Sequence, residues 1–75
     1  MKETASQAYT RTLLYTLPAT PDGKLHMKHP QLRRFGFFLL LDCLNDHFKL
    51  YFKDSDETLI FEDIDAVILS GWLAD

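Results

Sequence analysis

A run of ten residues in the middle of the chain, residues 35–44 (FGFFLLLDCL), is almost entirely apolar. Since neither face of such a segment tolerates water, it must lie inside the fold or beneath a second molecule. A buried strand and a buried helix look alike over a run of this length. Gly36 favours the strand, because glycine costs a helix about 1 kcal/mol relative to alanine. We therefore expect residues 36–44 to form a strand at the centre of the fold.

The segment after this run has the clearest alternating pattern in the chain. Residues 47–53 (HFKLYFK) alternate apolar and polar side chains, which predicts a strand with one face in the core. Asn45-Asp46 is a turn pair, so we expect 36–44 and 47–53 to form an antiparallel hairpin. Residues 58–61 predict a short strand that returns along this hairpin.

The remaining segments leave alternatives open. Residues 8–17 (AYTRTLLYTL) favour a strand because β-branched and aromatic residues dominate, although their spacing also fits a helix. Residues 62–73 favour a helix, because acids crowd its first turn and apolar residues share one stripe. A strand over 66–69 is the alternative there. Residues 25–27 can form a strand that closes a hairpin with 8–17, and residues 29–34 can begin a helix.

The predicted fold is α+β, with one domain over residues 1–75. We expect an antiparallel sheet of three to five strands, built on the 36–53 hairpin, with one or two packed helices. The alternative is a small all-β barrel, which the strand over 66–69 would close. The expected core consists of Leu13, Phe37, Leu39, Leu41, Phe48, Leu50, Phe52, Leu59, Phe61, Ile64, Val67 and Ile68.

The size of the chain and its single cysteine indicate the oligomeric state and the cellular compartment to expect. A domain of 75 residues buries only about 60% of its unfolded surface, so an oligomer is a natural source of added stability. Cys43 is the only cysteine, which excludes an intrachain disulfide and suits a reducing compartment. Residues 1–7 are polar and lack an apolar signal core. The run 35–44 is shorter than the roughly 20 residues that cross a bilayer. We expect a cytoplasmic protein without membrane contact.

No residue pattern in the chain indicates catalysis. The chain has neither a Gly-x-Ser-x-Gly motif nor a glycine-rich phosphate loop. Cys43 lies in an apolar run, where burial raises a thiol pKa and weakens the nucleophile. His26, His29, Cys43 and His47 offer nitrogen and sulfur donors for zinc, but the typical site uses paired cysteines. We predict no enzyme activity, no cofactor and no metal site.

Charge is unevenly placed in a chain whose net charge is −3. Residues 24–34 contain four basic residues and no acid, whereas residues 54–75 contain seven acids and no base. The two stretches can face each other in the fold, or one of them can meet a partner of opposite sign.

Protein binding is the function that we expect. Trp72 and Leu73 lie near the C-terminus beside acids such as Asp63 and Asp65, and aromatic residues anchor interfaces. We predict a non-catalytic protein-interaction or regulatory module with an apolar patch and an acidic rim. Its partner would be a second copy, giving a homodimer, or a basic protein.

The alternative is a small nucleic-acid-binding domain. Tyr51 lies between two lysines on one strand face, and single-strand binders interleave basic and aromatic residues in this way. The acidic net charge is unusual for such domains. The contacts would come from the basic stretch, namely Lys24, Lys28, Arg33 and Arg34.

Overall fold

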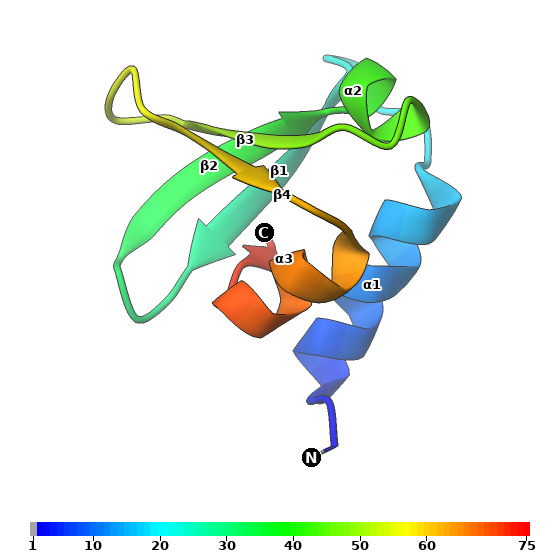
Figure 1. Ribbon diagram of the computed structural model, residues 1–75, viewed down its shortest axis with the longest axis vertical. Coiled ribbons are helices and arrows are strands. Elements are labelled where there is room, and N and C mark those ends of the chain that lie inside the picture. The colour runs from blue at the N-terminus through cyan, green and yellow to red at the C-terminus, as the bar shows by residue number, and fades with distance from the viewer. Residues whose placement is uncertain (1) are drawn as a thin grey trace.

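The computed structural model describes residues 2–75. Figure 1 shows a twisted sheet with two helices, α1 and α3, side by side on one of its faces. Along the chain the elements are α1 (Ala5–Thr16), β1 (Lys24–His29), β2 (Arg34–Leu39), α2 (Leu40–Leu44), β3 (Phe48–Phe52), β4 (Thr58–Phe61), α3 (Ile64–Ser70) and β5 (Leu73–Ala74). The strands form an open antiparallel sheet in the order β4-β3-β2-β1-β5. The α+β prediction is therefore confirmed, and the barrel alternative is wrong because the sheet stays open.

Residues 8–16 belong to α1 and Leu17 is its C-cap, so the prediction of a strand over 8–17 is wrong and the helical alternative is confirmed. The helix begins with a capping box in which the Gln7 N–H donates to Thr4 Oγ1 at 3.1 Å. The Thr4 N–H donates in return to Gln7 Oε1 at 2.8 Å. These bonds satisfy two amides that a helix start leaves without partners. Threonine hydroxyls along α1 bond to carbonyls one turn earlier, which accommodates β-branched residues inside the helix.

The apolar run 35–44 is divided between β2 and α2. The prediction of a continuous strand over 36–44 with Asn45-Asp46 as a tight loop is therefore wrong, because α2 occupies the connection. The predicted antiparallel pairing of this run with the next strand is confirmed, since Phe38 lies opposite Leu50. Gly36 permits the close approach of β3, because a Cβ there would lie 2.7 Å from the Tyr51 carbonyl oxygen.

The strand predicted over 58–61 is confirmed by β4. The helix predicted over 62–73 is confirmed only in its middle, because α3 covers Ile64–Ser70, Gly71 ends it with a φ of 94° and Leu73 belongs to β5. Residues 25–27 lie in β1 as predicted, but β1 pairs with β2 and β5. The prediction that a helix begins within 29–34 is wrong, because His29 ends β1, residues 30–33 form a turn and Arg34 begins β2.

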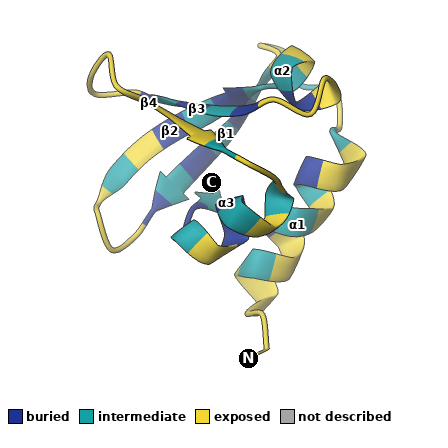
Figure 2. Cartoon of the chain, viewed as in Figure 1, coloured by how far each residue is buried: buried dark blue, intermediate teal, exposed yellow. Residues whose placement is uncertain are grey.

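The core lies between the sheet and the face of α1 and α3 that meets it (Figure 2). The predicted core members Phe48, Leu50, Phe52, Val67 and Ile68 are buried, and Leu13, Phe61 and Ile64 pack against them in part. Four predicted members are wrong: Phe37 and Leu39 lie on the opposite face of β2, Leu41 is 74% exposed and Leu59 is 42% exposed. For Phe37 and Leu39 the reason is register, because Phe38 between them pairs with buried Leu50. Leu59 lies opposite Leu50 on the core-facing side but belongs to the edge strand β4, and Leu41 belongs to α2. Core residues not predicted are Leu14, Leu25, Met27, Phe38, Cys43 and Trp72.

The described part of the chain contains no helix with the length and apolar character that a bilayer crossing needs.

Candidate functional site

Trp72 lies in the core, so the prediction that it anchors an exposed patch is wrong. Its side chain is only 1% exposed and meets the rings of His29 and Phe52 edge-on, at centroid distances of 5.3 and 5.5 Å. The chain reverses at Gly71 and returns along β1 as β5, which carries Trp72 under the sheet. Leu73 is half-buried and pairs with Lys28.

His29 fixes this reversal, and sequence reasoning did not find it. Its Nε2 lies 2.8 Å from the Ser70 carbonyl oxygen, and its Nδ1 accepts the Leu32 N–H at 3.2 Å. The ring therefore ties the end of α3 to the turn between β1 and β2. In the sequence His29 lies within a basic, turn-rich stretch, where exposed histidine is common, and nothing local indicates its burial.

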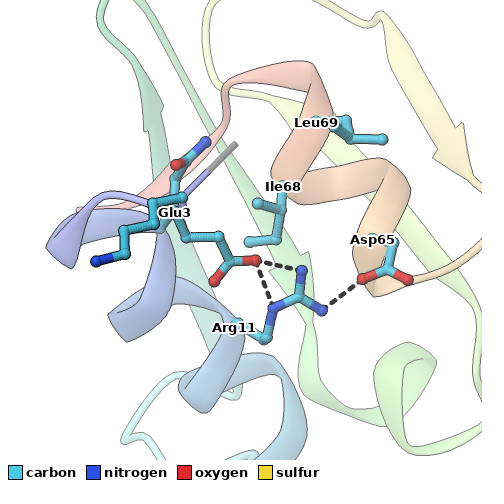
Figure 3. Close-up of a pocket in the computed structure, with 7 residues that line it drawn as sticks. Glu3, Arg11, Asp65, Ile68 and Leu69 are labelled. Carbon is cyan, nitrogen blue, oxygen red and sulfur yellow. Dashed lines mark hydrogen bonds and ion pairs between the residues drawn. The ribbon is translucent and has the colours of Figure 1, made fainter.

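The two acids predicted for the interface serve the fold. Asp63 caps α3 by accepting the Ala66 N–H at 2.8 Å. Asp65 pairs with Arg11 at 2.5 Å, and Glu3 pairs with the same guanidinium (Figure 3). Hydrogen bonds to these two carboxylates raise the pKa of Arg11. Arg11 therefore joins α1 to α3 at the wall of a pocket of about 370 Å³ that Ile68 and Leu69 also line.

β4 forms one edge of the sheet, and we call residues 56–63 the acidic β4 edge. Ile60 is 67% exposed and Leu59 is 42% exposed. The Phe52 N–H donates to the Glu57 carbonyl oxygen at 3.1 Å, which makes these two residues a hydrogen-bonded pair. In an antiparallel ladder such pairs alternate, so the N–H and C=O groups of Thr58 and Ile60 point away from β3.

Carboxylates flank this edge at both ends. Asp56 and Glu57 precede β4, and Glu62 and Asp63 follow it. Among the described residues, Asp56 and Glu62 make no ion pair. The edge thus combines exposed apolar side chains, free main-chain groups and uncompensated negative charge.

Arg34 stabilises the turn that leads into β4 and is not a free basic contact. Its guanidinium lies 3.8 Å above the Phe52 ring and bonds to Asp54 at 2.8 Å and to Glu57 at 3.4 Å. The bond from Arg34 lowers the pKa of Asp54. Arg34 is one of the four predicted nucleic-acid contacts. Two carboxylates already bind its guanidinium.

Lys24, Lys28 and Tyr51 lie on the sheet face that α1 and α3 do not cover, and we call this the open face. Register places Lys28 beside Phe35 and places Phe37 between His26 and Tyr51. The Phe37 and Tyr51 rings stack at 5.2 Å with 11° between their planes. Lys24 Nζ lies 4.5 Å from the Phe37 centroid, and Lys49 Nζ lies 5.1 Å from that of Tyr51.

The side chains considered for zinc are not brought together. His26 bonds to Asp22 at 2.7 Å, whereas His29 is buried beside Trp72. Burial raises the pKa of the Cys43 thiol to about 11, so the thiol stays protonated at neutral pH. Within residues 2–75 no three His, Cys, Asp or Glu side chains form a group that could hold a metal ion.

Comparison of the chain with protein-family models, with curated proteins and with solved structures finds no match. Function is therefore inferred from the acidic β4 edge and the open face themselves.

Proposed function

We propose that the protein is a non-catalytic protein-binding module that takes up an extended, basic segment of a partner along the acidic β4 edge. The observation that carries the proposal is the exposed apolar edge of β4 with two carboxylates at each end. An added strand gains main-chain hydrogen bonds from the edge, and alternate side chains supply selectivity. A regulatory role in the cytoplasm, where a lone thiol stays reduced, fits such a module.

The β4 edge is protected by its short length of four residues and by the carboxylates at its ends, and not by lysine, proline or a bulge. The carboxylates repel a second acidic strand but attract a basic one. Residues 58–61 (TLIF) contain no lysine and no proline, and they pair with β3 without interruption. The outward N–H and C=O groups of Thr58 and Ile60 are therefore available to a new strand.

Charge selects a basic partner over a second copy. Two β4 edges can pair only through Thr58 and Ile60, whose main-chain groups point outward. If Thr58 of one copy lay opposite Ile60 of the other in an antiparallel pair, Asp56 would lie opposite Glu62. If Ile60 lay opposite Ile60, Glu57 would lie opposite Asp63. Like charges directly opposite each other destabilise a strand pair. A segment with lysine or arginine at both ends reverses the sign of every one of these contacts, which favours the basic protein over the homodimer.

The test uses two synthetic peptides of alternating valine and threonine, one with lysines at both ends and one with glutamates. We expect calorimetry to show binding of the lysine peptide and none of the glutamate peptide. Ile60→Pro should abolish that binding, because proline removes an outward N–H without breaking the ladder to β3. Ile60→Thr is the matched control, since it keeps the N–H, and it should still bind.

Variants of the flanking carboxylates measure how much charge contributes to peptide binding, apart from the main-chain hydrogen bonds. Asp56→Asn and Glu62→Gln should each weaken the lysine peptide about two- to five-fold, as expected for exposed ion pairs. Asp75→Asn, at the opposite edge of the sheet, should have no effect. Equal binding by wild type and Ile60→Pro would contradict the proposal. So would a dimer, measured by light scattering, that Ile60→Pro dissociates, because a second copy would then occupy the edge.

A further inference from the structure

A pocket of about 360 Å³ lies at the turn between β1 and β2. Lys28, Arg33 and Phe35 line it together with His29, Pro30 and Arg34. Arg33 is exposed and makes no ion pair among the described residues. Phe35 is 49% exposed and stacks on no other ring in this part of the chain. The pocket thus offers the free charge of Arg33 beside a free aromatic face, and its second cation, Lys28, lies 3.9 Å from the Asp75 carboxylate.

This pocket continues into the open face. Lys28 of β1 lies opposite Phe35 of β2. Two residues further along β2, Phe37 lies opposite His26. Side chains two residues apart on a strand share a face and lie about 6.8 Å apart. Phe35 and Phe37 are therefore successive aromatic positions along one face, with lysines on both neighbouring strands.

Charge on the open face differs in sign from that of the whole chain. Lysines at positions 24, 28, 49 and 53 belong to this side of the sheet, where Asp22 pairs with His26 and Asp75 pairs with Lys28. Most other carboxylates lie along the acidic β4 edge and at the start of α3. At about 0.1 M salt, charges further apart than about 10 Å are largely screened, so the local lysines decide what binds here.

We propose that the open face binds single-stranded nucleic acid, with a phosphate held between Lys28 and Arg33 and a base stacked on Phe35. Lysine and arginine neutralise phosphates, and aromatic rings accept any base. This binding uses a surface different from the acidic β4 edge and stands independently of the function proposed above.

The rings of Phe37 and Tyr51 can extend the site along the strand. The two rings stack on each other, and each also has a lysine ammonium over it. An exposed lysine on a ring is held more weakly than a stacked base. A lysine that moves from the ring to a phosphate therefore leaves room for a base. Phe35 needs no such exchange, which makes it the first stacking position.

The experiment measures fluorescence anisotropy of a labelled oligothymidine of about 12 nucleotides, a length within the range that small sheet domains cover. We expect binding at low salt that weakens steeply between about 50 and 200 mM salt. Phe35→Ala should weaken binding between about 5-fold and about 150-fold, as expected when one stacked base is lost. Tyr9→Ala removes an exposed ring from α1 and should have no effect.

A second pair of variants tests the phosphate contact. Arg33 has a φ of 53°, so Arg33→Asn removes the charge with a residue that tolerates this backbone conformation. It should lower the slope of log affinity against log salt by about 0.7, the value for one phosphate contact on a single strand. Lys2→Gln, a matched loss of charge outside the open face, should leave the slope unchanged. Ile60→Pro should also bind the oligonucleotide normally, which separates this site from the β4 edge.

Three results would overturn the proposal. The first is absent or salt-independent binding by the wild type. The second is equal affinity for single-stranded and duplex DNA with no effect of Phe35→Ala, since phosphate attraction alone would then explain binding. The third is preference for an acidic peptide over the oligonucleotide, which would make the open face a protein-binding surface.

Discussion

Gly71 is the residue on which the position of Trp72 depends. Its φ of 94° is one that side chains rarely adopt, and a Cβ there would lie 2.7 Å from His29 Nε2. We expect Gly71→Ala to lower the free energy of unfolding by about 1–3 kcal/mol, because it adds overpacking to backbone strain. Gly23→Ala is the matched control, since its φ is 68° and nothing lies within 4 Å. The difference between the two variants in the free energy of unfolding, measured in urea, isolates the clash with His29. Equal losses of stability in both variants would show that the His29 side chain moves aside without destabilising the fold.

At the scale of elements, α1 is attached to β5 by the buried hydroxyl of Thr10. This hydroxyl donates to the Ser6 carbonyl oxygen at 2.8 Å and accepts the Ala74 N–H at 2.9 Å. Thr10→Val keeps the shape but leaves the Ala74 N–H without a partner, which costs about 1–3 kcal/mol. We expect that loss in urea unfolding and faster hydrogen exchange at Ala74. Thr12→Val is the control, because it removes an exposed hydroxyl that bonds only within α1. Unchanged hydrogen exchange at Ala74 in Thr10→Val would refute the attachment of α1 to β5.

The elements also show which parts of the fold the sequence could predict. β3 was predictable because one of its faces is buried and the other is not, so its side chains alternate. α1 was not, because β propensity outweighed a readable capping box at Thr4 and Gln7. The division of the run 35–44 into β2 and α2 leaves no periodic signal, since both halves are largely apolar.

At the scale of the molecule, the candidate surfaces depend on strand order, which no local pattern contains. β4 becomes a free edge only because β3 pairs with β2 on its other side, and Trp72 becomes buried only because β5 joins β1. The basic and acidic stretches were visible as charge in the sequence. Their separation between the open face and the β4 edge required the register of all five strands.

The helices and the sheet pack around one core. Two side chains in this core, Trp72 and Cys43, can each report on unfolding. Trp72 is the only tryptophan, and Cys43 of α2 is the only cysteine. Both side chains belong to one buried cluster that also includes Leu14 of α1 and Val67 of α3. Burial raises the pKa of Cys43 to about 11, so the folded thiol is neither accessible nor ionised at pH 8. We therefore expect alkylation of Cys43 to be slow in the folded protein and fast after unfolding.

The two probes should report one transition in urea. A small domain with a single core unfolds cooperatively, so Trp72 fluorescence and Cys43 alkylation should give the same midpoint. Denatured protein at the same pH supplies the control rate for a free thiol. If Cys43 reacted at a lower urea concentration than the Trp72 transition, α2 would open separately from the remainder of the core. The connection between β2 and β3 would then unfold as a separate unit. In that case Cys43 and Trp72 would not unfold in one cooperative transition, although both side chains are buried in the same core.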